Sequence, residues 1–298
     1  MLAYRSAVAT LTTVIALGSV MFLGAQSSQG PLPLEPSKVR GEAVYAAIEG
    51  WYHNADGTST LLLGYYNRNQ QQILDIPVGP NNAIEPGGPD QNQPTHFLPR
   101  RQWGVFSITV PKDFGQKKLT WTIVANDQKT QVAFWLNPPY ILDPFINLAN
   151  GNTPPKVKFG AGPELQGPPR GIATTLSGTV NEPVTLKLWA MDKPPTTAPE
   201  PGPNAGRGRG RGGEPPAPLN ITWNKYRGPG TVTFAAQKLP IRTPEGAEAE
   251  TTAKFSAPGE YWLLATANDN SGDGGGGDQC CWTNAHVKVN IRASATAQ

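Results

Sequence analysis

Cysteine and histidine are scarce in this chain, which has two cysteines and three histidines among 298 residues. The histidines, His53, His96 and His286, lie far apart and form no His-x-His or His-Glu-x-x-His motif, so the sequence carries no zinc signature. It also has no Gly-x-Ser-x-Gly motif, and no Ser, His and Asp set stands out as a catalytic triad. We therefore expect a protein that is not an enzyme and that has no resident cofactor, with calcium as the one possible exception.

Long apolar runs are absent except near the start of the chain. A basic start at Arg5 precedes an apolar run from Ala7 to Ala25 and the polar, proline-rich stretch AQSSQGPLPLEP. This order is typical of a secretory signal, here residues 1–27, with cleavage after Ser27. The run is also long enough for an uncleaved membrane anchor, which stays open as an alternative. We expect an exported protein, periplasmic or extracellular, that contacts the membrane only if this segment is retained.

Excess charge of one sign is small. The formal net charge is +3, and it is carried by Arg5 and by the segment 193–218, which has four basic and two acidic residues. The rest of the chain is neutral, so it offers no broad basic surface for phosphates, and we expect no nucleic-acid partner. The arginines at 207, 209 and 211 are interpreted as part of a solvated, flexible loop.

Proline and glycine are abundant, with 31 and 33 residues, and they separate short runs rich in Val, Ile, Thr and aromatic residues. Such runs are typical of β-strands. In the segment 183–192 the apolar residues alternate with polar ones, which predicts a strand with one buried face. The strands expected on this basis are residues 42–53, 58–67, 72–78, 104–110, 119–125 and 131–136 in the first half, and 156–159, 174–180, 183–192, 219–226, 230–235, 249–257, 260–269 and 286–292 in the second.

The predicted fold class is all-β, with two β-sandwich domains in tandem. A stretch rich in proline, residues 138–155, interrupts the strand pattern and is interpreted as a linker, because proline has no amide hydrogen for a sheet. It separates an N-terminal domain, residues 39–137, from a second domain, residues 156–292. Within the second domain, the Pro- and Gly-rich residues 193–218 are predicted to be a disordered insertion.

The second half resembles PKD and related immunoglobulin-like domains of bacterial extracellular proteins. The resemblance rests on GTVNEPVTLKLWAMD, ITWNKYRGPG and AKFSAPGEYWLLATANDNSG and covers roughly residues 172–292. It implies that Trp223 is the core tryptophan and that Tyr261 occupies the tyrosine-corner position, with its hydroxyl bonded to backbone. The first half, with GYYNRNQ, LDIPVGPNN and PTHFLPRRQWGVFSITVPKDFG, is similar to exported bacterial proteins that pair such a domain with an immunoglobulin-like one. That second resemblance implies no activity.

The two cysteines, Cys280 and Cys281, are adjacent and follow a run of four glycines. In an oxidising compartment three arrangements stay open: a disulfide between the neighbours, a bond to another chain, or two free thiols. A disulfide between neighbours needs a distorted turn, which the preceding glycines allow.

The same stretch suggests a cation site. Asp269, Ser271 and Asp273 alternate and are followed by Gly274, which is similar to the first half of a calcium-binding loop. The twelfth position is Cys280 instead of a bidentate glutamate. An acidic, glycine-rich loop between two late strands is the alternative.

Residues 78–102 form a connection longer than sandwich loops usually are. Amide, carboxylate and guanidinium groups lie there beside aromatic rings, a combination suited to sugar or peptide recognition. The alternative is an ordered loop that packs over the open end of the sandwich with its arginines bonded to its own carbonyls. The candidate ligand-binding residues are Asn82, Asp90, His96, Arg100, Arg101 and Trp103.

Taken together, these patterns favour a non-catalytic, exported binding or structural module of the bacterial cell envelope, whose partner is a glycan or another envelope protein. A carbohydrate-binding protein that uses the loop 78–102 is a second hypothesis. A hydrolase is the third, and it requires Asp75, Asp90 and His96 to share one pocket. The sugar-binding hypothesis requires Trp103 or another aromatic ring to lie exposed beside Asn or Asp side chains.

Overall fold

The computed structural model of the chain describes residues 36–148, 150–193, 218–243, 245–269 and 280–294. The chain divides into two compact units, residues 1–37 and 38–298, and every strand of the described residues lies in the second unit. The predicted signal, residues 1–27, lies outside the described residues, as does the predicted insertion 193–218 apart from its two end residues. Within the described ranges, no helix is both long and apolar enough to span a membrane.

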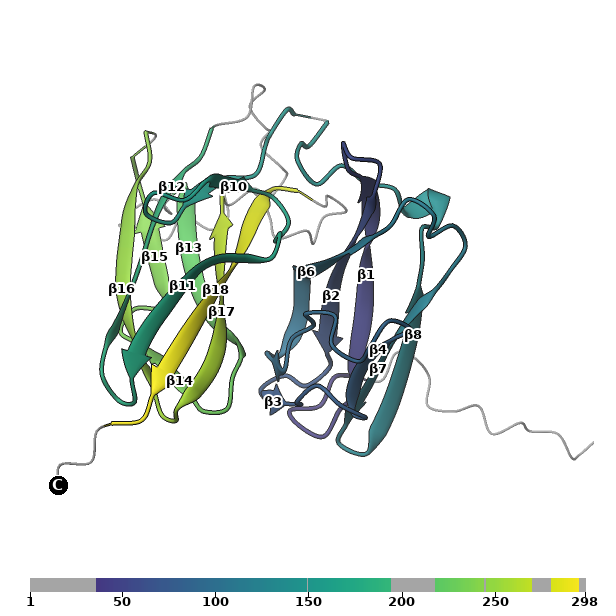
Figure 1. Cartoon of the computed structure of the whole chain (residues 1–298), viewed down its shortest axis with the longest axis horizontal. Coiled ribbons are helices and arrows are strands. Elements are labelled where there is room, and N and C mark those ends of the chain that lie inside the picture. The colour runs from purple at the N-terminus through teal and green to yellow at the C-terminus, as the bar shows by residue number, and fades with distance from the viewer. Residues whose placement is uncertain (1–35, 149, 194–217, 244, 270–279, 295–298) are drawn as a thin grey trace, which may run out of the picture. The chain divides into compact units, whose positions relative to one another are not determined.

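The second unit is all-β and contains two β-sandwiches in tandem (Figure 1). The one helix in the described part of the chain is the single turn η1 (Pro138–Tyr140), between the two sandwiches in sequence. The first sandwich has one sheet of order β1-β2-β6 and another of order β4-β7-β8, with a short ladder of β3 and β5 beside them. Its strands are β1 (Val44–His53), β2 (Ser59–Asn67), β3 (Leu74–Asp75), β4 (Asn82–Glu85), β5 (His96–Phe97), β6 (Arg100–Val110), β7 (Leu119–Ala125) and β8 (Gln128–Phe134).

The core of the first sandwich is aromatic. Trp121, Phe106 and Phe97 are fully buried between the sheets, and Trp121 packs edge-on against Phe106 with ring centroids 5.2 Å apart. Alternation along β7, where every second residue is buried, places Trp121 on the inner face. Burial of aromatic side chains such as these supplies a large share of the hydrophobic stabilisation.

Strand β6 carries a bulge in its first half. Leu63 of β2 pairs with Phe106, and Tyr65 pairs with Gln102, so one residue of β2 faces three residues of β6. Gly104, in the middle of the bulge, has a φ of +51°, which a residue with a side chain adopts only under strain. The bulge turns the backbone of residues 103–105 away from the ladder and toward the second sandwich.

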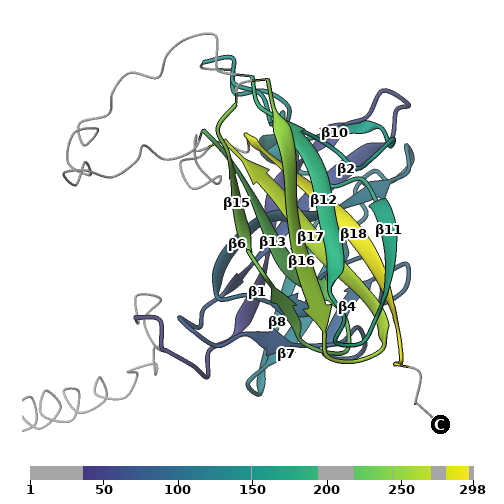
Figure 2. The ribbon, with the colours of Figure 1, turned by 90° about the vertical axis from the view of Figure 1, so that its left-hand side faces the viewer.

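The second sandwich has the strand arrangement of an immunoglobulin domain (Figure 2). One sheet has the order β10-β9-β12-β16-β14 and the other the order β11-β18-β17-β13-β15, with β11 parallel to β18 and the other pairs antiparallel. Apart from β10 and β11, which are additional strands at the sheet edges, these orders correspond to strands A-B-E-D and G-F-C-C′ of that fold. The strands are β9 (Lys156–Lys158), β10 (Glu164–Gln166), β11 (Ile172–Thr179), β12 (Val184–Met191), β13 (Leu219–Arg227), β14 (Val232–Phe234), β15 (Lys238–Ile241), β16 (Ala247–Phe255), β17 (Gly259–Asn268) and β18 (Trp282–Arg292).

Two residues singled out by the resemblance occupy the expected places. Trp223, on the strand equivalent to C, is fully buried. Tyr261, at the start of the strand equivalent to F, donates a hydrogen bond from its hydroxyl to the Ala257 carbonyl at 2.8 Å and accepts one from the Gly230 amide at 3.0 Å. The core tryptophan and the tyrosine corner are therefore confirmed.

The segment 78–102 is more ordered than its sequence indicates. Instead of one irregular connection, it contains β4, β5 and the start of β6. The pattern gives no warning because strands of two to four residues are too short for alternation to be recognised, and prolines and glycines flank them. For the same reason β10 and β15 have no clear periodic signal, whereas β3 lies within the predicted strand 72–78.

The tyrosine corner gives a stability prediction. Changing Tyr261→Phe removes the hydroxyl and leaves the Gly230 amide and the Ala257 carbonyl without their partner. We expect the free energy of unfolding, measured by chemical denaturation, to fall by about 1–3 kcal/mol. Tyr140→Phe is the control, because Tyr140 is 48% exposed and its change should alter stability by less than about 0.5 kcal/mol. Equal stabilities for the two variants would contradict the assignment.

Candidate binding groove

The first sandwich contacts the second through a polar network that we call the seam. Part of it joins the segment before β6 to β13. The Arg227 guanidinium binds both carboxylate oxygens of Asp90, at 2.8 and 3.1 Å, and its Nε donates to the Gln93 carbonyl at 2.7 Å. The Tyr226 hydroxyl donates to the Asn92 carbonyl at 2.6 Å. A two-pronged guanidinium contact of this kind fixes orientation as well as distance.

The other part of the seam joins the β6 bulge to β18. Asn284 Nδ2 donates to the Gly104 carbonyl at 2.9 Å, and His286 Nε2 donates to the Val105 carbonyl at 3.0 Å. Asn284 and His286 are each 3% exposed, so both side chains are buried, and these two N–H groups find their acceptors across the seam. The bulge is what makes these two carbonyls available, since an unbroken ladder would use such groups within its own sheet.

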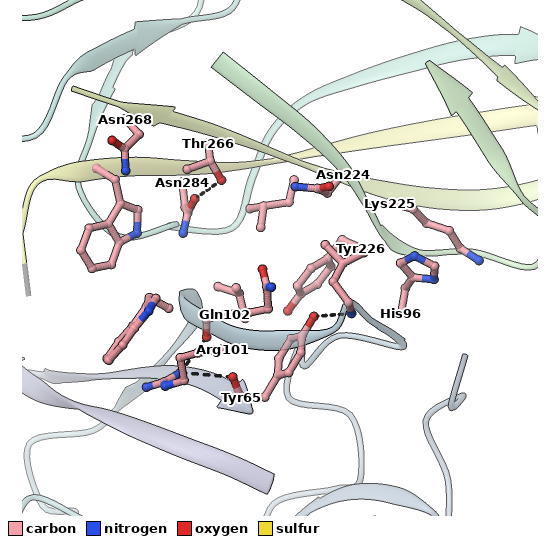
Figure 3. A pocket seen from close by; sticks show the side chains of 15 residues that line it. Tyr65, His96, Arg101, Gln102, Asn224, Lys225, Tyr226, Thr266, Asn268 and Asn284 are labelled. Carbon is pink, nitrogen blue, oxygen red and sulfur yellow. Dashed lines mark hydrogen bonds between the residues drawn. The ribbon is translucent and has the colours of Figure 1, made fainter. Parts of the chain in front are cut away.

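Between these two sets of contacts lies a cavity of about 200 Å³, which we call the seam groove. Figure 3 shows that its labelled side chains come from both sandwiches, with Asn268, Thr266 and Asn284 on one wall and Tyr65, Arg101 and Gln102 on the other. Its aromatic members are Tyr65, Trp103, Tyr226 and Trp282, and its polar members are His96, Arg101, Gln102, Asn224, Lys225, Thr266, Asn268 and Asn284.

Arg101 is held rigidly at the edge of the groove. Its Nη2 lies 2.6 Å from Glu49 Oε2, and its Nη1 donates to the carbonyls of Gln102 at 2.7 Å and Tyr65 at 3.2 Å. The guanidinium lies over the Trp103 ring, 3.9 Å from the centroid. Burial raises the pKa of Glu49, against the opposing effect of the Arg101 charge and hydrogen bond. The opposite charges of Arg101 and Glu49 therefore offset each other, and the stacked guanidinium holds the Trp103 ring in place as one side of the groove.

Several groups in the groove keep hydrogen-bonding capacity. The indole N–H groups of Trp103 and Trp282 have no hydrogen-bond partner among the described residues. Asn224 Oδ1 accepts from Gln237, whereas its amide N–H groups have no hydrogen-bond partner among the described residues. The groove thus combines a partly exposed indole ring, Trp103, and a buried one, Trp282, with side-chain amides that their neighbours hold in place.

Asp75 and His96 are in contact beside the groove, but they form no catalytic set. Asp75 Oδ1 lies 2.8 Å from His96 Nδ1 and 2.9 Å from Lys225 Nζ. Burial alone would raise the pKa of Asp75, yet the hydrogen bonds from His96 and Lys225 outweigh it and lower this pKa to about 2. Asp90 is bound by Arg227 instead, so Asp75, Asp90 and His96 do not share one pocket.

The hydroxyl groups of the groove give the hydrolase hypothesis no nucleophile either. Among the residues that line it, the one aliphatic hydroxyl belongs to Thr266, and it donates to Asn284 Oδ1 at 2.6 Å. Among the described residues, no base hydrogen-bonds to that oxygen in a way that would activate it.

The structure separates the predicted ligand-binding residues into three groups. His96, Arg101 and Trp103 line the seam groove. Asn82 is fully buried and serves the fold: its Nδ2 donates to the carbonyls of Ile76 and Pro94, and its Oδ1 accepts from the Trp121 indole at 2.9 Å. Asp90 belongs to the seam through its pairing with Arg227, and Arg100 is exposed at the start of β6 with a φ of +67°.

Most of the groove comes from residues that the sequence did not point to. Tyr226, Trp282 and Asn284 belong to β13 and β18, more than a hundred residues away from the loop 78–102. The sequence does contain one indication of these residues: Asn284 and His286 are polar side chains among the buried residues of the last strand. Buried polar residues of this kind require a partner, and here the partner is the first sandwich.

The cysteine pair lies just before β18. Cys280 and Cys281 are joined to each other by a disulfide and are 5% and 1% exposed. Of the residues considered for calcium, Ser271 and Asp273 lie outside the described residues, while Asp269 accepts a hydrogen bond from Asn152 Nδ2. No group of three or more His, Cys, Asp or Glu side chains converges as a metal site in the part of the chain that the structure describes.

Comparison with known proteins yields only distant structural similarity. No protein-family model matches the chain, and no curated protein matches it in sequence. The D00-D0 domain of intimin is 10% identical with a TM-score of 0.26, covering 84% of this chain and 100% of that one. Titin Ig tandem domains A164-A165 are 9% identical with a TM-score of 0.22, covering 85% and 100%. Domains 4 and 5 of the S-layer protein SbsC are 11% identical with a TM-score of 0.20, covering 84% and 98%. TM-scores this low carry no argument about activity or partners.

The buried imidazole in the seam predicts a pH dependence of stability. Burial lowers the pKa of His286 to about 4, and the nearby Arg227 charge lowers it further against the opposing hydrogen bond to Val105. His286 binds a proton near pH 6.5 in the unfolded chain and near pH 4 in the folded chain. Its contribution to the free energy of unfolding is therefore complete above pH 6.5 and is lost as the pH falls toward 4.

We expect the free energy of unfolding of His286→Gln, which keeps an N–H donor for Val105, to fall less steeply between pH 6.5 and 4 than that of the unaltered chain. Chemical denaturation at several pH values measures this slope. His53→Gln is the control, because His53 is exposed and lies outside the seam. A slope that is the same with and without His286 would show that this histidine titrates equally in both states.

Proposed function

We propose that this chain is a non-catalytic, exported binding module of the bacterial cell envelope, and that the seam groove binds a glycan. The observation that carries the proposal is the pairing of indole rings from both sandwiches, Trp103 and Trp282, with side-chain amides in one cavity. Export rests on the signal-like residues 1–27, and the absence of an assembled acid, base and nucleophile in the groove favours binding over catalysis.

The chemistry of the groove suits a sugar ring. A pyranose has a face of C–H groups that packs on an indole ring, and hydroxyl groups around its edge that bond to amides. The cavity of about 200 Å³ is below the ~300–1,000 Å³ of pockets for drug-sized ligands, so it fits one terminal sugar residue better than a long chain. Asn224, Gln102 and the two indole N–H groups supply donors and acceptors at its edge.

Rigidity supports the same proposal. Arg101 is fixed by Glu49 and by two carbonyls, and Asn284 is fixed by Gly104 and Thr266. Side chains that are already ordered lose little conformational entropy when a ligand binds. When a ligand binds, ordering the side chains of this groove therefore costs less free energy than ordering the side chains of a flexible loop.

A structural role is the second candidate. The seam buries polar groups such as His286 and Lys225, and each of them forms a hydrogen bond with a residue of the other sandwich. Such a joint holds two domains in a fixed relation, which is what a spacer in the envelope requires. This candidate predicts a stable joint with no ligand in the groove.

A glycan array followed by calorimetric titration of the best hit tests the proposal. We expect the purified chain to bind a glycan with a defined terminal sugar. Trp103→Ala and Asn224→Ala should each weaken binding at least tenfold, about 1.4 kcal/mol. Trp135→Ala, which removes a partly exposed indole outside the groove, is the matched control and should bind like the unaltered chain.

Two outcomes would contradict the proposal. The array could give no hit with correctly folded protein, which would favour the structural role. Alternatively, a hit could be weakened as much by Trp135→Ala as by Trp103→Ala, which would place the sugar outside the seam groove.

A further inference from the structure

Three oxygen-bearing side chains gather at one end of the second sandwich, outside the seam groove. Asn152 precedes β9, Asp192 directly follows β12, and Asp269 directly follows β17. Asn152 Nδ2 donates to Asp269 Oδ2 at 2.5 Å, and the negative charge of Asp269 acts on Asp192. Met191, the last residue of β12, pairs with Lys156 of β9, so Asp192 follows at the end of the strand beside the segment that contains Asn152. The three residues thus belong to one cluster, although 40 or more positions separate each from the next in the sequence.

Two acceptor oxygens in this cluster have no hydrogen-bond partner among the described residues. One is Asn152 Oδ1, on a side chain that is 1% exposed, and the other is Asp192 Oδ1, which is also buried at the level of the atom. Because Nδ2 of the Asn152 amide is bound to Asp269, the amide is fixed in place and its Oδ1 lies near the Asp269 carboxylate. Buried acceptors without a donor are uncommon and costly, and an ion that a structure does not contain is one of their ordinary explanations.

The charge balance leads to the same conclusion. Within the described residues no Lys, Arg or His forms an ion pair with Asp192. The Asp192 carboxylate, near that of Asp269 and without a paired cation among the described residues, therefore adds to a site of negative potential.

We propose that Asp192, Asp269 and the Asn152 side-chain oxygen bind one Ca²⁺ ion. The ligands are all oxygen, which favours a hard cation over zinc, and the neighbouring cysteines provide no thiolate because they are joined in a disulfide. Calcium takes 6–8 oxygen ligands in flexible geometry, so it accepts a partial protein shell completed by backbone carbonyls and water. An affinity of about 10⁻⁴–10⁻³ M, typical of extracellular modules, suits a site with only two carboxylates.

The ion would connect three separate parts of the chain. Asn152 belongs to the segment predicted as the linker, whereas Asp192 and Asp269 end strands of opposite sheets of the second sandwich. Binding would fasten that segment to the sandwich and would stabilise the folded state, since the unfolded chain has no such arrangement. This role does not depend on the glycan proposal, because none of the three residues lines the seam groove.

Calorimetric titration of CaCl₂ into the EDTA-treated, dialysed full-length chain tests the proposal, together with thermal melts in EDTA and in CaCl₂. We expect one Ca²⁺ per chain and a melting temperature several degrees higher in CaCl₂. Asp192→Asn and Asp269→Asn should each weaken binding at least tenfold. Asp113→Asn, which removes the same charge from an exposed site in the first sandwich, is the matched control and should bind like the unaltered chain.

The melts separate a cation site from a purely structural role. In EDTA, Asp192→Asn should melt at or above the temperature of the unaltered chain, because it removes a buried charge; in CaCl₂ it should melt below it. Lack of calcium binding by the unaltered chain would overturn the proposal, as would unchanged affinity in both variants. The same loss of melting temperature with and without calcium in Asp192→Asn would also overturn it.

Discussion

The seam depends on two buried polar side chains of β18, Asn284 and His286, whose Nδ2 and Nε2 groups donate to carbonyls of the other sandwich. A buried amide and a buried imidazole without partners would each cost roughly 1–3 kcal/mol. The bulge in β6 prevents this cost, because it presents the carbonyls of Gly104 and Val105 outside their own sheet. The contact between the sandwiches therefore depends on hydrogen bonds to buried polar groups as well as on the burial of apolar surface. Because hydrogen bonds are directional, they allow only a small range of orientations between the two sandwiches.

The groove follows from the same constraint. The residues that satisfy β18 bring the Trp103 ring and Trp282 to one cavity, and an added carbon at Gly104 would lie 3.1 Å from the Trp282 ring. A side chain at Gly104 would thus crowd the Trp282 indole. It would also strain the backbone of the bulge, because φ is positive there. The same short segment of β6 provides the seam contacts and one wall of the groove, so recognition and domain arrangement cannot be altered independently there.

Local patterns predicted most of the strands but not the seam. Alternation in 183–192 and the Pro-Gly-x-Tyr sequence before Tyr261 depend on neighbouring residues, and both lead to the observed strand and corner. Contacts such as Asn284 with Gly104 join residues 180 positions apart, and no pattern of period two contains them. The role of Asn82 was missed for a related reason: an asparagine in a proline-rich loop resembles a turn residue until the Trp121 indole is seen to donate to it.

Native-state hydrogen exchange of the Thr95 amide is the most direct test of the seam, since this N–H donates to the Tyr226 carbonyl on the other sandwich at 3.2 Å. If the seam is an integral part of the fold, Thr95 exchanges as slowly as the core amides of β17 and opens only with global unfolding. If Thr95 exchanges at a rate close to that of an unprotected loop amide while β17 stays protected, the sandwiches separate freely and the seam does not hold them together.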